Sequence, residues 1–347
     1  MEITLPPEQK NAFTWYGPSW VSRQEQWIVT LAPSEIAELE SAAEHWDAAH
    51  KTGNIETVIV QDFLLPTLAR KLMELREELI HGRGFVLLRG LPTANYTERE
   101  AAIIFCGLGS HLGLARPQNA QGHLLGHVRD MGMTSTDPNV RIYQTKERQT
   151  FHTDSTDVVG LLCLSTAKKG GLSLLVSSNT IFNEMRKRRP DLLPLLLGPI
   201  ATDRRGEIPE GMQPYYLIPV FNYYQGYLSA IYQRQYIESA QRFAEAPRLT
   251  AEHIEALNLF DELANSMELN FSMTLEQGDM QFVYNHTLLH DRTGFEDWPE
   301  MSRKRHLLRL WLSIPGDRPL PEIFAEKFGS VEIGNRGGIV VQRDTNS

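Results

Sequence analysis

The chain has 347 residues, of which 41% are hydrophobic and 22% are charged, and its formal net charge is -9. This composition indicates a globular protein and excludes a disordered or fibrous one. The acidic balance disfavours nucleic acid as a partner, and the sequence has no apolar stretch near the ~18 to 20 residues of a membrane span, so we expect a cytoplasmic protein.

The first 80 residues predict a helical extension. Residues 33–47 have a helical pattern with Ser34 as the N-cap, and Ala37 stands where a capping box would need Glu or Gln. A second apolar stripe at helical spacing follows and ends at Gly82. Its members are Leu68, Leu72, Met73, Leu75 and Leu79. The run FVLLRG (85–90) then predicts a buried strand.

Strand patterns dominate the chain after this point, with three further helices. We expect the helices over residues 97–112, 179–197 and 250–267. The expected strand segments are 123–130, 140–145, 158–167, 171–178, 215–232, 271–285 and 306–314. We see no repeat or low-complexity linker. The pattern therefore predicts one domain over 1–347, with a helical extension (1–80), a β core (about 80–315) and a C-terminal tail (316–347).

The segment Phe151-His152-Thr153-Asp154 carries the sharpest chemical signal. In a strand, residues i and i+2 point to the same face, so the His152 imidazole and the Asp154 carboxylate converge. A third ligand is offered by His290, which follows a Gly-Asp turn and a strand pattern. Two histidines and one carboxylate form a facial triad that leaves positions open on Fe(II). The same triad also suits a zinc-dependent hydrolase or a non-catalytic, cupin-like binding protein.

Two arginines in KRHLLRLWLSI add to this signal. Arg305 and Arg309 stand at i and i+4, and we expect both guanidinium groups on one side. A buried guanidinium is a planar fork of donors that holds a carboxylate in fixed geometry. The distal carboxylate of 2-oxoglutarate requires such a partner, and the two alternative functions have no clear use for it.

Together these segments resemble the TauD/TfdA family of Fe(II)/2-oxoglutarate-dependent dioxygenases. The resemblance covers about residues 80–315 and rests on four motifs in the order of that family. They are FHTDSTD (151–157), KKGGLSLLVSS (168–178), NHTLLHDRTGF (285–295) and RHLLRLW (305–311). The resemblance implies a mainly β fold with helical cover, a double-stranded β-helix (jelly roll, cupin-like) with iron at its mouth.

The resemblance also implies roles for individual residues. The iron ligands would be His152, Asp154 and His290. Arg305 matches the arginine that pairs with the far carboxylate of 2-oxoglutarate, and Ser173 adds a hydroxyl hydrogen bond. Arg309 matches a residue near the inner carboxylate of 2-oxoglutarate or the anionic group of the substrate.

The sequence offers further candidate residues that the four motifs do not assign directly. The long segment FEDWPEMSR leaves a choice between Arg303 and Arg305 for the 2-oxoglutarate arginine. Gln118 and Asn119 fall where this family often lines its substrate pocket. Arg204 and Arg205 are weaker candidates for meeting an anionic substrate, and the run GNRGGIVV (334–341) is a candidate cover for the mouth of the site.

The sequence therefore predicts an enzyme that needs Fe(II), 2-oxoglutarate and O₂. It would oxidise an unactivated C–H bond of a small anionic substrate, such as an amino acid or carboxylate, and release succinate and CO₂. Hydroxylation is the default outcome, with desaturation or cyclisation as variants, and the carboxylate at Asp154 argues against a halogenase. Secondary metabolism is as reasonable a setting as catabolism, and oligomer formation stays open.

Overall fold

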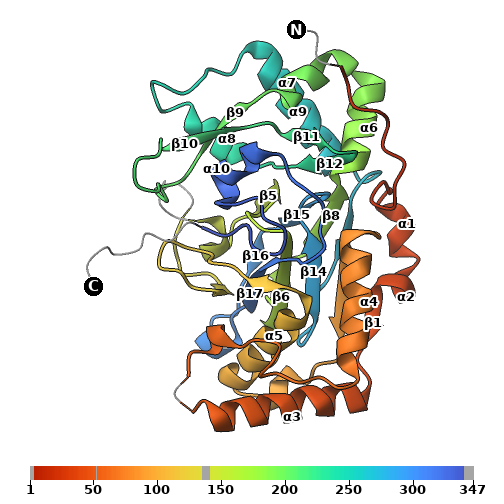
Figure 1. Cartoon of the computed structure of the whole chain (residues 1–347), viewed down its shortest axis with the longest axis vertical. Coiled ribbons are helices and arrows are strands. Elements are labelled where there is room, and N and C mark those ends of the chain that lie inside the picture. Colours follow the sequence, from red (N-terminus) through yellow and green to blue (C-terminus); the bar gives the residue numbers. More distant parts are fainter. Residues whose placement is uncertain (1–3, 52, 135–140, 340–347) are drawn as a thin grey trace.

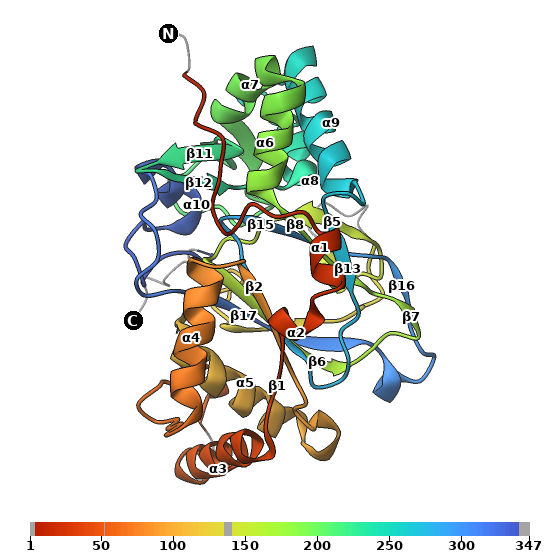
Figure 2. The same ribbon diagram turned by 90° about the vertical axis from the view of Figure 1, so that its right-hand side faces the viewer.

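The computed structural model describes residues 4–51, 53–134 and 141–339. Two β-sheets form the centre of the molecule, and helices cover the outer side of each (Figures 1 and 2). The larger sheet has the strand order β1-β2-β14-β6-β17-β3, and β4 also pairs with β17. Its strands are β1 (Ile28–Thr30), β2 (Phe85–Arg89), β3 (Leu114–Ala115), β4 (Leu125–Val128), β6 (Val158–Ser165), β14 (Met280–Tyr284) and β17 (His306–Ser313).

The smaller sheet has the order β13-β8-β15-β5 and is antiparallel throughout. Its strands are β5 (Gln149–His152), β8 (Ser173–Ser177), β13 (Phe271–Met273) and β15 (Leu288–Arg292). Three two-stranded ribbons complete the β structure. They are β7 (Lys169–Gly170) with β16 (Phe295–Glu296), β9 (Ile200–Asp203) with β10 (Tyr215–Ile218), and β11 (Phe221–Tyr224) with β12 (Tyr227–Ala230). The architecture is the expected mainly β jelly roll with helical cover.

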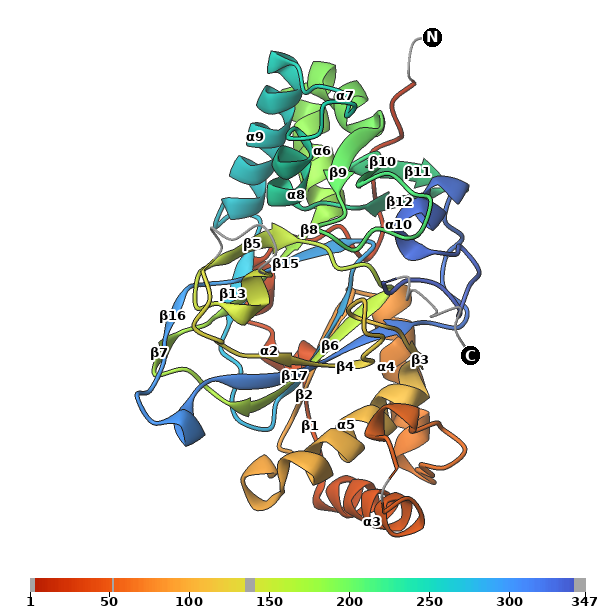
Figure 3. The ribbon, with the colours of Figure 1, turned by 90° about the vertical axis from the view of Figure 1, so that its left-hand side faces the viewer.

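The helices form two groups at opposite ends of the molecule, with the sheets between them (Figure 3). One group consists of α3 (Pro33–Ala49), α4 (Leu68–Ile80) and α5 (Glu98–Leu112), and the other of α6 (Ser178–Arg188), α7 (Leu193–Leu197) and α9 (Ala251–Asn265). The short helices are α1 (Pro18–Val21), α2 (Gln24–Trp27), α8 (Arg234–Ala240) and α10 (Ala325–Phe328). The 3₁₀ turns are η1 (Ile55–Thr57), η2 (Thr93–Asn95), η3 (Ile142–Gln144), η4 (Pro190–Leu192), η5 (Met301–Arg303) and η6 (Glu322–Phe324).

Strand alternation in β17 separates the helix-covered core from the space between the sheets. Leu308, Leu310 and Leu312 belong to the core that includes α3, α4 and α5. Leu307 and Trp311 belong to the core that the two sheets share. Because side chains alternate along a strand, Arg309 points with Leu307 and Trp311 into the space between the sheets.

Several local predictions need correction. Helix α3 begins at Pro33, so its N-cap is Ala32 and not Ser34, and the Glu35 carboxylate accepts a hydrogen bond from the Ala32 N–H at 2.8 Å. The described part of the expected strand 140–145 is the 3₁₀ turn η3. The expected helix 179–197 is interrupted after Arg188, where Pro190 opens η4 before α7 begins. The other expected helices and strands are present with shifted ends. None of the described helices is long and apolar enough to cross a membrane.

A buried ionic network ties the C-terminal segment to the sheets. Arg336 is fully buried, and its guanidinium donates to Asp157 and Asp317, each at 2.8 Å. His286 Nε2 lies 2.8 Å from Asp157, and the Tyr284 hydroxyl donates to Asp317. Burial tends to raise the pKa of Asp157, but the His286 hydrogen bond and the Arg336 charge outweigh it and lower that pKa. The tail is therefore part of the folded core at this point.

Replacing Arg336 by Met tests this network. The substitution leaves two buried carboxylates without their cation, so we expect the free energy of unfolding to fall by about 3 to 5 kcal/mol. The measurement is equilibrium urea denaturation. As a control, Arg70→Met removes the exposed Arg70–Glu74 pair and should change the free energy by less than about 1 kcal/mol. Equal urea midpoints for Arg336→Met and the parent would contradict the assignment.

Candidate active site

The three predicted metal ligands come together at one edge of the smaller sheet. His152 ends β5 and is the direct cross-strand partner of His290 on β15. The expected strand geometry for the His152–Asp154 pair is only partly present. His152 lies in β5, whereas Asp154 lies two residues beyond the end of that strand. The Nε2 atoms of His152 and His290 lie 3.9 and 3.7 Å from the Asp154 carboxylate oxygens. One ligand atom from each residue lies within 4.8 Å of the others.

Hydrogen bonds fix the orientation of this cluster. His152 Nδ1 donates a hydrogen bond to the Thr150 carbonyl oxygen at 2.8 Å, and its Nε2 accepts one from Gln149 Nε2 at 2.8 Å. A metal bound at His152 Nε2 would take the place of the Gln149 donor. The Trp311 indole N–H donates to Asp154 Oδ2 at 2.9 Å, and the Asp154 N–H donates to the Asn285 side chain. His290 Nδ1 is buried and has no hydrogen-bond partner in the described structure.

The electrostatics favour the protonation states that a metal ligand needs. Burial, reinforced by neighbouring His290, lowers the pKa of His152 to about 3, so its imidazole is neutral near pH 7. Burial tends to raise the pKa of Asp154, but the Arg309 charge and the His290 hydrogen bond hold it far below its usual range. A neutral imidazole beside an ionised carboxylate suits a divalent cation.

An inner cavity lies beside this cluster, between the two sheets. Its empty volume is about 570 Å³, including solvent at its opening. The polar or charged side chains that line it are Gln149, His152, Asp154, Ser173, Gln281, His290, Asp291, Arg292, Arg305 and Arg309. Arg305 is 5% exposed, and its Nη1 is buried without a hydrogen-bond partner in the described structure. Burial lowers the pKa of Arg305 to about 10.

Sequence reasoning missed a third arginine in this cavity, which Arg305 and Arg309 also line. Arg292 stands two residues after His290 in β15, so strand alternation places both on one face, and this spacing could have revealed it. Its guanidinium donates to the Thr145 and Glu147 carbonyls, while its Nε has no partner in the described structure. Burial, together with the charge of Arg305, lowers the pKa of Arg292 to about 9.

These buried donors fit a dicarboxylate such as 2-oxoglutarate. The unpaired Arg305 nitrogen requires an acceptor, because a buried donor without one is unfavourable. Ser173 lines the same cavity, and its hydroxyl donates to Gln281 Oε1 at 3.0 Å. Arg303, the alternative candidate, is half-exposed beside Glu300, and its guanidinium lies 3.6 Å from the centroid of the Trp298 ring. The geometry therefore favours Arg305 over Arg303.

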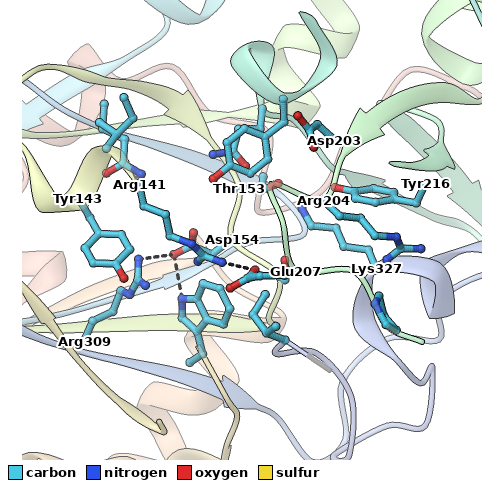
Figure 4. A pocket seen from close by; sticks show the side chains of 18 residues that line it. Arg141, Tyr143, Thr153, Asp154, Asp203, Arg204, Glu207, Tyr216, Arg309 and Lys327 are labelled. Atoms are coloured by element: carbon cyan, nitrogen blue, oxygen red, sulfur yellow. Dashed lines mark hydrogen bonds and ion pairs between the residues drawn. The ribbon is translucent and has the colours of Figure 1, made fainter. Parts of the chain in front are cut away.

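A second cavity, the side cavity, shares Tyr143, Gln149, Asp154 and Arg309 with the first. Its empty volume is about 790 Å³, including solvent at its opening. Figure 4 shows Arg309 and Tyr143 on one side of Asp154, and Arg204, Tyr216 and Lys327 on the other. The remaining lining residues are Arg141, Ile142, Thr153, Ser155, Asp203, Glu207, Pro209, Gln233, Tyr236, Trp311 and Ile339.

Arg309 stands where the two cavities meet and is held from several sides. Its Nε donates to Gln118 Oε1 at 2.6 Å, and its Nη1 lies 3.7 Å from Asp154 Oδ2. The guanidinium lies over the Tyr143 and Trp311 rings, 4.7 and 4.9 Å from their centroids. This arrangement fixes a cation at the boundary between the predicted co-substrate site and the side cavity.

The two predicted substrate contacts occupy other positions. Gln118 is buried, lies outside the lining of both cavities, and also donates to the Arg309 and Leu124 carbonyls. It therefore positions Arg309. Asn119 lies outside both linings as well, and its side chain bonds with His123. His286 also lies outside both linings and belongs to the Asp157–Arg336 network.

The C-terminal segment reaches the side cavity. The N–H of Gly338 donates to the Ser155 carbonyl, and Ile339, whose N–H donates to the Pro117 carbonyl, lines the cavity. The last residues of the GNRGGIVV run lie outside the described residues. Its role as a cover stays a prediction, and deletion after Gly334 would also remove Arg336 from the core.

Comparison with known proteins identifies the family of the chain. Residues 48–311 match the "Taurine catabolism dioxygenase TauD, TfdA family". FR-33289 synthase of Streptomyces rubellomurinus is 33% identical over 313 residues, which cover 87% of this chain and 89% of that protein. Taurine hydroxylase-like protein SAT17 of Stachybotrys chartarum is 31% identical over 320 residues, covering 89% and 80%.

A solved structure confirms the fold. An asparagine oxygenase in complex with Fe(II), 2S,3S-3-hydroxyasparagine and succinate superimposes with a TM-score of 0.64 at 18% identity, covering 82% of this chain and 93% of that one. The zinc-hydrolase and binding-protein alternatives are not favoured by these relatives. The chain belongs to the TauD/TfdA family and is a non-haem iron dioxygenase that uses 2-oxoglutarate and O₂.

Proposed function

We propose that this dioxygenase oxidises an unactivated C–H bond of a small anionic molecule, such as an amino acid or a related acid, with hydroxylation as the default outcome. The observation that carries the proposal is Arg309, a buried guanidinium at the junction of the two cavities and 3.7 Å from the proposed metal ligand Asp154. The asparagine oxygenase structure, whose ligand is a hydroxylated amino acid, supports this substrate class.

His152, Asp154 and His290 hold Fe(II) in this proposal. When bound, iron and 2-oxoglutarate together activate O₂ for C–H oxidation, and the co-substrate leaves as succinate and CO₂. Trp311 fixes one carboxylate oxygen of Asp154, and the Thr150 carbonyl fixes the His152 ring, so these two ligands are oriented before the metal arrives.

The inner cavity holds 2-oxoglutarate, with its far carboxylate on Arg305. Ser173 supplies a hydroxyl from the facing sheet, and Arg292 adds a second positive charge. These charges lie in a buried space, where a charge-assisted hydrogen bond is stronger than in water. The side cavity then receives the substrate, with Arg309 facing its anionic group or the inner carboxylate of 2-oxoglutarate.

Substitution of the metal ligands gives a direct test. We expect Asp154→Asn and His152→Ala to lose stoichiometric Fe(II), because each removes one of three ligands. The measurement is anaerobic iron titration with equilibrium dialysis. His123→Ala serves as the control, since His123 lies outside both cavities and should leave the stoichiometry unchanged. Stoichiometric, undiminished iron binding in both ligand variants would contradict the assignment.

Substitution of the candidate arginines tests the co-substrate site. In the anaerobic Fe(II) protein, 2-oxoglutarate chelation should give a visible charge-transfer band. We expect Arg305→Met to weaken 2-oxoglutarate binding by about 10- to 100-fold, the equivalent of about 1.5 to 3 kcal/mol for a charged hydrogen bond. Arg303→Met is the matched control and should bind as the parent does. The reverse pattern would assign the role to Arg303.

A further inference from the structure

Helix α10 contributes a cation to the side cavity from outside the family match. The match ends at residue 311, whereas α10 spans Ala325–Phe328 and places Lys327 in the cavity lining. Figure 4 shows Lys327 on the side of Asp154 away from Arg309. The cavity therefore has positive groups at two separate positions.

The structure holds α10 firmly against the cavity. Arg204 donates to the Glu326 carbonyl at 2.7 Å and pairs with the Glu326 carboxylate at 3.0 Å. Phe328 is buried in a core with Tyr216, and its carbonyl accepts the Gly337 N–H at 3.0 Å. Arg204, a candidate for substrate contact by sequence, thus acts here as the residue that positions the helix.

Lys327 differs from the neighbouring cations of the side cavity in having no acidic partner in the described structure. Arg141 pairs with Glu207, and Arg204 pairs with Glu326. Asp203, the remaining acid besides Asp154, pairs with Arg242 and accepts from Ser239. Lys327 makes no ion pair or hydrogen bond within the described parts of the chain.

Lys327 is half-buried in the cavity lining, and its partial removal from water disfavours the charged form. This desolvation lowers the pKa of the ammonium to about 8, and the distant charge of Asp154 only partly opposes this effect. An anion placed next to the ammonium would supply the missing counter-charge. Lysine offers a compact charge with three donors, which suits an oxyanion of any geometry, whereas arginine favours planar groups.

We propose that Lys327 binds an oxyanion of the substrate at the end of the side cavity away from Arg309. This inference rests on the proposed function of the cavity and adds a specificity-determining residue to it. The oxyanion is a carboxylate, a sulfonate or a phosphonate. The substrate is thereby held at its acidic end by α10, while the remainder of the molecule extends toward Asp154 and the proposed metal site.

The experiment uses the full chain loaded anaerobically with Fe(II) and 2-oxoglutarate. The charge-transfer band is recorded first, because it reports the proposed cofactor sites independently of Lys327. Acetate, methanesulfonate and methylphosphonate are then titrated separately by calorimetry at constant ionic strength. The variants are Lys327→Met, which removes the charge, Lys327→Arg, which keeps it, and Lys187→Met, a control at an exposed lysine of α6.

We expect at least one anion to bind the parent and the Lys187→Met control equally. Its affinity should fall at least tenfold in Lys327→Met and recover in part in Lys327→Arg, and the anion that binds best identifies the acidic group. Lys327→Gln repeats the test if Lys327→Met does not form the band. Unchanged affinity in the neutral variant, or no binding of any of the three anions by the parent, overturns the inference. Absence of the band in the parent instead contradicts the proposed function.

Discussion

The active site depends on buried positive charge that the protein's own carboxylates compensate only in part. Arg292, Arg305 and Arg309 line one cavity between two sheets, and the carboxylates that share it are already engaged. Asp291 pairs with Arg148, and Asp154 lies within 4 Å of two histidines and of Arg309. Arg292 and Arg305 have no carboxylate partner among the described residues. Burying cations in this way costs free energy unless anions complete the site. The arrangement is therefore explained by ligands that bring negative charge.

The jelly roll allows this arrangement because side chains alternate along each strand. One face of a strand packs in the core, and the other face lines the site. In β17, leucines on one face pack under the helices, while Arg309 and Trp311 on the other face reach the site. In β15, His290 and Arg292 share a face, which joins the proposed metal and co-substrate sites on a single strand. The geometry of β15 therefore supports neighbouring metal and co-substrate sites.

The sequence was informative where chemistry and short spacing coincide. The His152–Asp154 pair lies within three residues, and cross-strand pairing brings His290 opposite His152, so this cluster could be predicted from motifs. Lys327 could not be predicted, because it lies on a four-residue helix whose position is set by a distant partner, Arg204. Gln118 was found as a polar residue near the site, but its role in holding Arg309 required the folded structure. The one-domain division and the residue roles remain predictions.

Two local predictions, the N-cap of α3 and the strand over residues 140–145, were wrong. Ser34 carries a good capping side chain, yet the helix begins one residue earlier at Pro33, whose fixed φ suits a first helical position. The alternating pattern of residues 140–145 favours a strand, but the described part forms a 3₁₀ turn whose Tyr143 side chain lies under the Arg309 guanidinium.

The most direct test of the central claim is an anaerobic crystal structure of the protein with Fe(II) and 2-oxoglutarate. The account predicts one metal on His152, Asp154 and His290, and 2-oxoglutarate in the inner cavity with its far carboxylate on Arg305. A metal at another site, or 2-oxoglutarate bound outside the cavity with Arg292 and Arg305 still unpaired, would contradict it.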